Sequence, residues 1–152
     1  MVLSFLRDLW FHFMGPVDTV CDLISEWEPD NASSEAAIEE SLHAHLTKHL
    51  RGLDIRRQFP HDRVRADILI NEEVAIEIKL DLVTAAEFHR LIGQLDCYAR
   101  WGVRMVVLLV GQVDPDLKAR VEERLLKDWS DEDEARVVLV PTRQVNSRHN
   151  LG

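Results

Sequence analysis

The feature that most constrains this chain is the stretch from Val64 to Asp81, in which apolar and polar residues alternate. Alternation with a period of two is typical of β-strands, because successive side chains point to opposite faces of a sheet. The pattern is interrupted around Glu72, so we expect two antiparallel strands joined by a turn at that residue. One apolar face of each strand should then lie in the core. These core positions are Ala66, Ile68 and Ile70 on the first strand, and Ile76, Ile78 and Leu80 on the second.

The opposite face of the same two strands carries charged residues. If the hairpin turns symmetrically about Glu72, Asp67 lies across from Glu77 and Arg65 across from Lys79. Facing carboxylates repel each other unless they share a proton or a cation. Mg²⁺ or Mn²⁺ takes oxygen ligands and would remove this repulsion, so Asp67 and Glu77 are candidate metal ligands. The other interpretation is a solvated strand face on which Asp67 pairs with Lys79 or Arg65.

Further elements are predicted before and after this hairpin. Apolar residues at helical spacing predict three helices before it, and a short run with period two predicts one more strand. After the hairpin we expect helix, strand, helix and strand; Thr84 and Glu87 form a capping box for the first of these helices, and Gly102 ends it. The predicted helices cover residues 2–14, 16–27, 34–50, 84–101 and 114–129, and the predicted strands cover 54–59, 63–70, 74–80, 103–110 and 136–140.

This order of elements predicts the α/β fold class. A three-strand antiparallel meander followed by helical crossovers requires a mixed central sheet flanked by helices. We expect an N-terminal helical extension over residues 1–30, a main domain over 31–145 and a polar tail over 146–152.

The charge of the chain excludes general attraction to nucleic acid. Lys and Arg total 18 against 27 Asp and Glu, which gives a net charge of -9. Any contact with DNA therefore needs a local basic surface or metal ions. Between His43 and Ala66 six cations face two acidic residues, a local charge of +4. This segment is a candidate phosphate-binding surface, and a solvated helix end beside an arginine-rich edge strand is the alternative.

The N-terminal segment predicts self-association rather than membrane insertion. Met1 to Met14 is too short to span a bilayer and is interrupted by Arg7 and Asp8. Cys21 and Cys97 have neither metal-ligand nor disulfide spacing, so we expect a reduced, cytoplasmic protein. The first helix should present one broad apolar face, and we expect a homodimer through the N-terminal helices, with packing of this face against its own domain as the alternative. This face consists of Leu3, Leu6, Leu9, Trp10 and Phe13.

One combination of residues resembles a known family. Asp67 precedes Glu77-Ile78-Lys79 by ten residues, a glutamate-bearing helix lies upstream, and Gln94 and Tyr98 follow on the next helix. This pattern resembles the PD-(D/E)xK nuclease superfamily, and within it the RecB-type and Holliday-junction-resolvase-like branch. The resemblance covers residues 34–111 and implies a restriction-endonuclease-like core. Many relatives have Gly or Pro just before the aspartate, where this chain has Ala66.

The resemblance implies a role for each matching residue. Asp67 and Glu77 would be the metal ligands for Mg²⁺ or Mn²⁺, and Lys79 the catalytic lysine. Gln94 and Tyr98, one helical turn apart, would orient the lysine region or contact DNA, with Arg65 as a further accessory residue; a core tyrosine is the alternative for Tyr98. The helix acid is Glu39, because its spacing to the buried leucines matches that of the family. Glu35 and Glu40 compete for this role.

The functional expectation is a metal-dependent deoxyribonuclease acting in DNA repair, recombination or defence. The fold also includes members that only bind or act as scaffolds. The alternative is therefore a catalytically silent interaction module.

Overall fold

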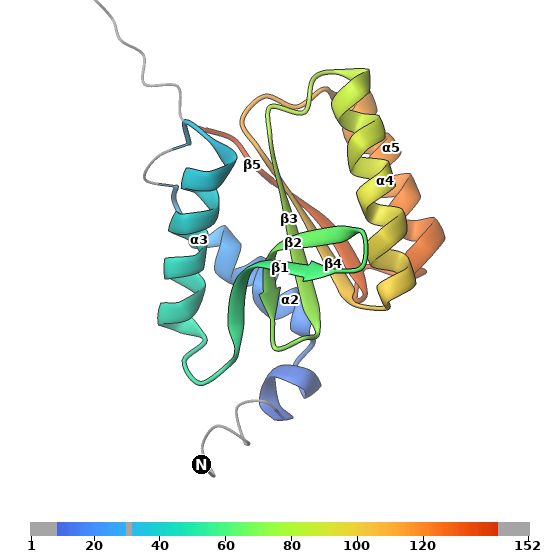
Figure 1. Ribbon diagram of the computed structural model, residues 1–152. Helices are drawn as coiled ribbons and strands as arrows, with labels where there is room; N and C mark the ends of the chain where they lie inside the picture. Colours follow the sequence, from blue (N-terminus) through green and yellow to red (C-terminus); the bar gives the residue numbers. More distant parts are fainter. Residues whose placement is uncertain (1–8, 30–31, 143–152) are drawn as a thin grey trace, which may run out of the picture.

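The protein is organised around a five-stranded mixed sheet (Figure 1). The computed structural model describes residues 9–29 and 32–142. The strand order is β1-β2-β3-β4-β5; the first three strands are antiparallel, whereas β3, β4 and β5 run parallel. This confirms the α/β class and the predicted mixed sheet. The strands are β1 (Ile55–His61), β2 (Val64–Ile70), β3 (Val74–Leu80), β4 (Arg104–Val110) and β5 (Ala135–Val140).

Two layers of helices cover the sheet, with α2 and α3 on one face and α4 and α5 on the other (Figure 1). Their ends follow the local signals. Ser34 accepts a hydrogen bond from the Ala37 N–H at the start of α3, and Thr84 accepts one from the Glu87 N–H at the start of α4. Gly102 ends α4 in a left-handed conformation, with φ of 83°. The helices are α2 (Pro16–Ser25), α3 (Glu35–His49), α4 (Ala85–Trp101) and α5 (Pro115–Trp129).

The core consists of two apolar layers on either side of the sheet. β4 contributes to both of them, because every residue after Arg104 is buried, as predicted for a central strand. Val106, Leu108 and Val110 pack toward α2 and α3. The residues between them pack toward α4 and α5.

The predicted core face of β2 is wrong at one position. Ile68 and Ile70 pack toward α2 and α3, but Ala66 belongs to the opposite apolar layer, together with Leu69. Ala66 and Ile68, two positions apart on one strand, therefore lie on different sides of the sheet. The regular pleat of β2 is interrupted at Asp67, between Ala66 and Ile68, and this interruption positions the candidate site.

The N-terminal segment packs differently from the predicted apolar face. Residues 9–13 are helical, but Leu3 and Leu6 lie outside the described residues. The side chain that enters the core is Phe11, which the predicted face did not include, whereas Trp10 and Phe13 are exposed. Helix α2 also buries its apolar side, through Val17 and Ile24, against the sheet of the same chain. In the described part of the chain, no helix is long and apolar enough to cross a membrane.

Candidate active site

The site forms where β2 and β3 separate. Their register pairs Ile68 with Ile76, the pairing predicted from a turn about Glu72. Regular pairing then stops, so Asp67 and Glu77 do not form the predicted cross-strand pair. Instead the Ile78 N–H donates a hydrogen bond of 2.8 Å to Asp67 Oδ2. The Asp67 side chain thus takes the place of a backbone acceptor and is held against β3.

Glu77 is one of the two most deeply buried charged side chains in the described residues, with 2% of its surface exposed. The Tyr98 hydroxyl donates to Glu77 Oε2 at 2.6 Å, and Lys79 Nζ lies 3.3 Å from Oε1. Burial, followed by the negative charge of Asp67, raises the pKa of Glu77 from its usual 4.5 to about 7. The contacts with Tyr98 and Lys79 oppose this rise. Glu77 therefore changes protonation near neutral pH.

Asp67 has a similarly shifted pKa. Burial raises the pKa of Asp67 from 3.8 to about 6, and the charge of Glu39 adds to the rise. The hydrogen bond from the Ile78 N–H and the charge of Lys79 lower it. Each of these groups acts on the pKa of Asp67, so Asp67, Lys79 and Glu39 belong to one electrostatic neighbourhood.

The helix acid that faces Asp67 is Glu39. Only 4% of Glu39 is exposed, and its carboxylate accepts hydrogen bonds from Arg57 Nη2 at 3.0 Å and from Gln58 Nε2 at 2.5 Å. Glu35 is exposed and accepts a hydrogen bond from the Leu80 N–H. Glu40 is also exposed. Among the three candidates, Glu39 is therefore the buried one, and its charge acts on Asp67.

A small hollow of about 190 Å³ opens beside these carboxylates. Residues from α3, β1 and β2 surround it. Gln58, whose role was not predicted, bridges Glu39 and Asp67. The sequence could have placed Gln58 near Asp67, because the predicted meander sets β1, which contains Gln58, beside β2. The hollow is lined by Glu35, Ala36, Glu39, Gln58 and Asp67.

Helix α4 supports the site from the other side. Tyr98 is fully buried, and its hydroxyl also lies 3.3 Å from the Arg65 carbonyl oxygen. The hydroxyl points into the protein, so Tyr98 orients Glu77 and does not reach a ligand at the surface. One turn earlier, the buried Oε1 of Gln94 has no hydrogen-bond partner among the described residues. The Arg65 side chain is exposed.

The chemistry of the site suits a hard divalent cation. Asp67 and Glu77 offer carboxylate oxygens, which Mg²⁺ and Mn²⁺ prefer, and each carboxylate keeps acceptor capacity beyond its present hydrogen bonds. The described residues contain no group of three or more His, Cys, Asp or Glu side chains arranged as a metal site. Two carboxylates with waters and a substrate phosphate are a sufficient set for Mg²⁺, so the residues fit such an ion.

The predicted basic segment is partly neutralised within the fold. Arg56 pairs with Asp54 at 2.8 Å, and Arg57 pairs with Glu39. Arg63 and Arg65 lie in or near the β1–β2 hairpin and are exposed. β1 is the edge strand of the sheet, and this hairpin also carries Gln58 and Asp67, which line the hollow.

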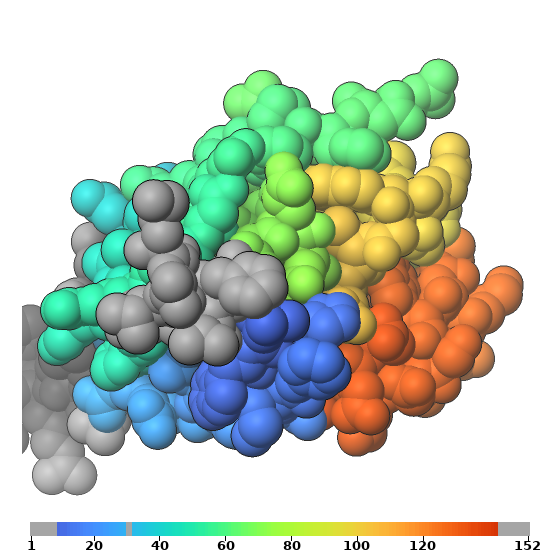
Figure 2. Space-filling model, turned by 90° about the horizontal axis from the view of Figure 1, so that it is seen from below, coloured from blue at the N-terminus to red at the C-terminus, as the bar shows by residue number. Residues whose placement is uncertain are grey.

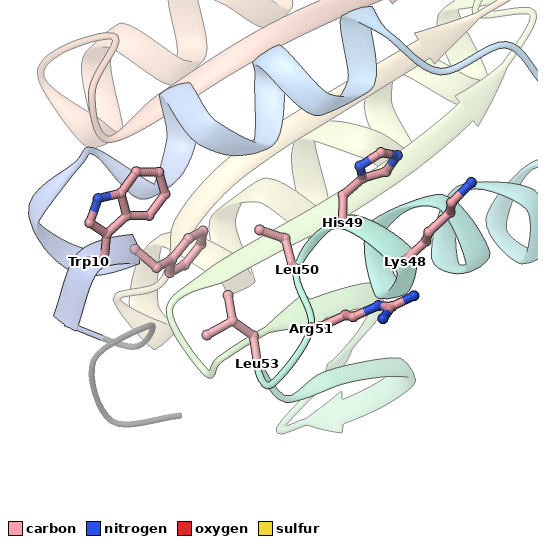
Figure 3. Close-up of a pocket in the computed structure, with 7 residues that line it drawn as sticks. Trp10, Lys48, His49, Leu50, Arg51 and Leu53 are labelled. Carbon is pink, nitrogen blue, oxygen red and sulfur yellow. The ribbon is translucent and has the colours of Figure 1, made fainter. Parts of the chain in front are cut away.

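A second, apolar hollow lies at the end of α3 (Figure 3). Its volume is about 340 Å³, and the side chains around it include Trp10, Leu50 and Leu53, with cationic groups of Lys48 and Arg51 at its rim. Phe13, one helical turn after Trp10, is 79% exposed. Figure 2 shows the first described residues at the surface beside the β2–β3 turn, where His12 contacts Glu73.

Comparison with known proteins adds little to this picture. No family model matches the chain, and no curated protein matches it. A solved structure of Pyrococcus furiosus SfsA in complex with Ca²⁺ aligns with a TM-score of 0.44 and 19% sequence identity. The alignment covers 69% of this chain and 55% of that chain, so this chain matches about half of SfsA. A likeness at this level carries no argument about function, which has to come from the site itself.

Proposed function

We propose that this protein is a metal-dependent deoxyribonuclease of the PD-(D/E)xK type, built on a restriction-endonuclease-like core of α3, β1 to β3, α4 and β4. The observation that carries the proposal is the buried Glu77 beside Lys79 on β3, electrostatically coupled to Asp67 on β2. Carboxylates whose pKa is raised by burial and by a neighbouring charge, with a lysine beside them, are typical of functional sites.

Each side chain has a role that follows from its contacts. Asp67 and Glu77 would hold Mg²⁺ or Mn²⁺, which supplies positive charge that activates water and screens the phosphate. Lys79 is largely covered and lies 3.3 Å from Glu77, so its ammonium group is held where it can orient the attacking water or stabilise developing negative charge. Tyr98 orients Glu77, and Gln94 lies one turn away on the same helix.

DNA is the proposed substrate because of the charges near the site. The chain as a whole repels phosphate, but Arg63 and Arg65 are exposed on the β1–β2 hairpin, the same hairpin whose Gln58 and Asp67 line the hollow. Arg65 and Arg63 would contact the phosphate backbone there. Such contacts predict binding that weakens steeply with added salt.

The test is Mn²⁺-dependent cleavage of linear, nicked, branched and single-stranded DNA by wild type and Lys79→Ala. We expect cleavage by wild type and a loss of at least about 100-fold in the variant, because lysine acts on charge that develops in the transition state. Lys127→Ala, on the exposed side of α5, is the matched control and should retain activity. Equal cleavage by wild type and Lys79→Ala would refute the assigned role.

A specific surface also supports the second candidate function, an interaction module. The apolar hollow of Figure 3 is lined by the exposed Trp10, with Lys48 and Arg51 at its rim, and the exposed Phe13 follows one helical turn after Trp10. We propose that a second copy of the chain occupies this surface, because the acidic remainder of the protein complements the rim in charge. Light scattering should then give a dimer for wild type and a monomer for Phe13→Ser. A monomeric wild type would refute the dimer. Substitution is preferable to truncation because α2 belongs to the core.

A further inference from the structure

Gln58 lies at an interruption that β1 and β2 share. The register pairs Arg57 with Ile68 and Phe59 with Ala66, which leaves Gln58 facing Asp67 without a regular pair between them. The backbone of Gln58 is left-handed, with φ of 51°. For a residue other than Gly or Asn this conformation is uncommon and costs free energy, and such strain is concentrated at functional sites.

The side chain of Gln58 connects two carboxylates. Its Nε2 lies 2.5 Å from Glu39 Oε1 and 3.2 Å from Asp67 Oδ1. A side-chain amide nitrogen carries two N–H groups, so it can donate to both oxygens at once. The partial positive charge of the amide therefore lies between two groups that otherwise repel each other. A divalent cation would reduce the repulsion between the two carboxylates in the same way.

Arg57 completes the arrangement on the α3 side. Its guanidinium pairs with Glu39 Oε2, so Glu39 keeps a charged partner even without Gln58. Asp67 Oδ1 has Gln58 as its hydrogen-bond donor, whereas Oδ2 is held by the Ile78 N–H. The oxygen that Gln58 covers is therefore the one that a cation in the hollow would approach.

We propose that Gln58 stands in for the metal ion in the metal-free protein and competes with it for Asp67. This inference rests on the proposed function, because it takes Asp67, which lines the hollow, as a ligand of the cation. Gln58 is a positioning residue: it preserves the arrangement of Glu39 and Asp67, and it lowers the affinity for the cation because its hydrogen bond to Asp67 has to be broken on binding. The strained backbone of Gln58 is the consequence of directing its side chain into the hollow.

The experiment compares wild type with Gln58→Asn in calorimetric titrations with Mn²⁺ and in thermal unfolding without metal. Asn tolerates the left-handed backbone, but its side chain is one methylene too short to connect the two carboxylates. We expect Mn²⁺ to bind the variant roughly tenfold more tightly, because one competing hydrogen bond to a charged group is lost. The metal-free variant should also melt at a lower temperature, and saturating Mn²⁺ should remove that difference.

The controls separate this inference from the proposed function. Gln112→Asn makes the same chemical change on the exposed loop after β4 and should alter neither measurement. If wild type and Gln58→Asn bind Mn²⁺ equally, or if the variant binds it more weakly, the role of Gln58 is refuted while the metal site stands. If wild type does not bind Mn²⁺, both proposals fail. Should Gln58→Asn fail to fold, Gln58→Gly relieves the backbone strain, removes the same amide and should again bind Mn²⁺ more tightly.

Discussion

Replacing Asp67 by Asn should stabilise the metal-free protein at pH 8. Burial, with the charge of Glu39, raises the pKa of Asp67 from 3.8 to about 6. A group with a raised pKa in the folded state contributes stability below its unfolded pKa, and this contribution is lost as the pH rises through the folded pKa. At pH 8 the ionised Asp67 is therefore unfavourable in the fold. The asparagine of the variant carries no charge and keeps an oxygen that can accept the hydrogen bond of the Ile78 N–H. Its amide nitrogen cannot accept the hydrogen bond of Gln58, and this loss offsets part of the gain.

The size of the effect follows from the pKa. One pKa unit corresponds to about 1.4 kcal/mol, so the ionised carboxylate costs about 3 kcal/mol at pH 8 relative to a neutral group. At pH 5 most of the folded wild type has taken up the proton, so the advantage of the variant should fall to about half. For a chain of this size, 3 kcal/mol corresponds to roughly 6–12 °C in melting temperature.

Thermal unfolding in a chelator, at pH 5 and pH 8, measures the difference. Asp133→Asn removes a carboxylate from an exposed turn and should change the melting temperature little at either pH. Mn²⁺ binding should be lost in Asp67→Asn, so added metal should stabilise only the wild type. A variant that is less stable than wild type at both pH values, or a difference that does not change with pH, would show that burial and repulsion do not control this carboxylate.

Three further substitutions test the supports of the site and the fold. Tyr98→Phe removes the donor to the buried Glu77, so urea unfolding at pH 8 should show a loss of about 2 kcal/mol, and an NMR titration should show a further rise in the pKa of Glu77. Gly111→Ala places a Cβ 2.3 Å from Asp81 Oδ1 at a residue with φ of 84°, and urea unfolding should show a loss of about 2 kcal/mol or more. Thr84→Ala removes the cap of α4 and should cost about 1 kcal/mol in the same assay, whereas an unchanged midpoint would mean that water replaces the cap.

Local signals determined the elements of this fold, their order along the chain and the antiparallel meander of the first three strands. The period of two between Val64 and Asp81 predicted β2, β3 and the register about Glu72, because pleating and turn symmetry depend only on residues close in sequence. The caps at Ser34 and Thr84 are local for the same reason. The two-residue spacing of Glu77 and Lys79 predicts that both side chains lie on one side of β3, and Lys79 Nζ lies 3.3 Å from Glu77 Oε1.

Tertiary packing decided which polar groups meet. The packing of α3 on β1 decides which of its three glutamates is buried. The buried one is Glu39, and Gln58 of β1 connects it to Asp67. The pleat of β2 is interrupted because β1, β2 and α3 must fit together. This interruption places Ala66 in the other apolar layer and turns Asp67 toward the Ile78 N–H. Periodicity describes one strand at a time, whereas the burial that raises the pKa values of Asp67 and Glu77 exists only once distant segments exclude water together.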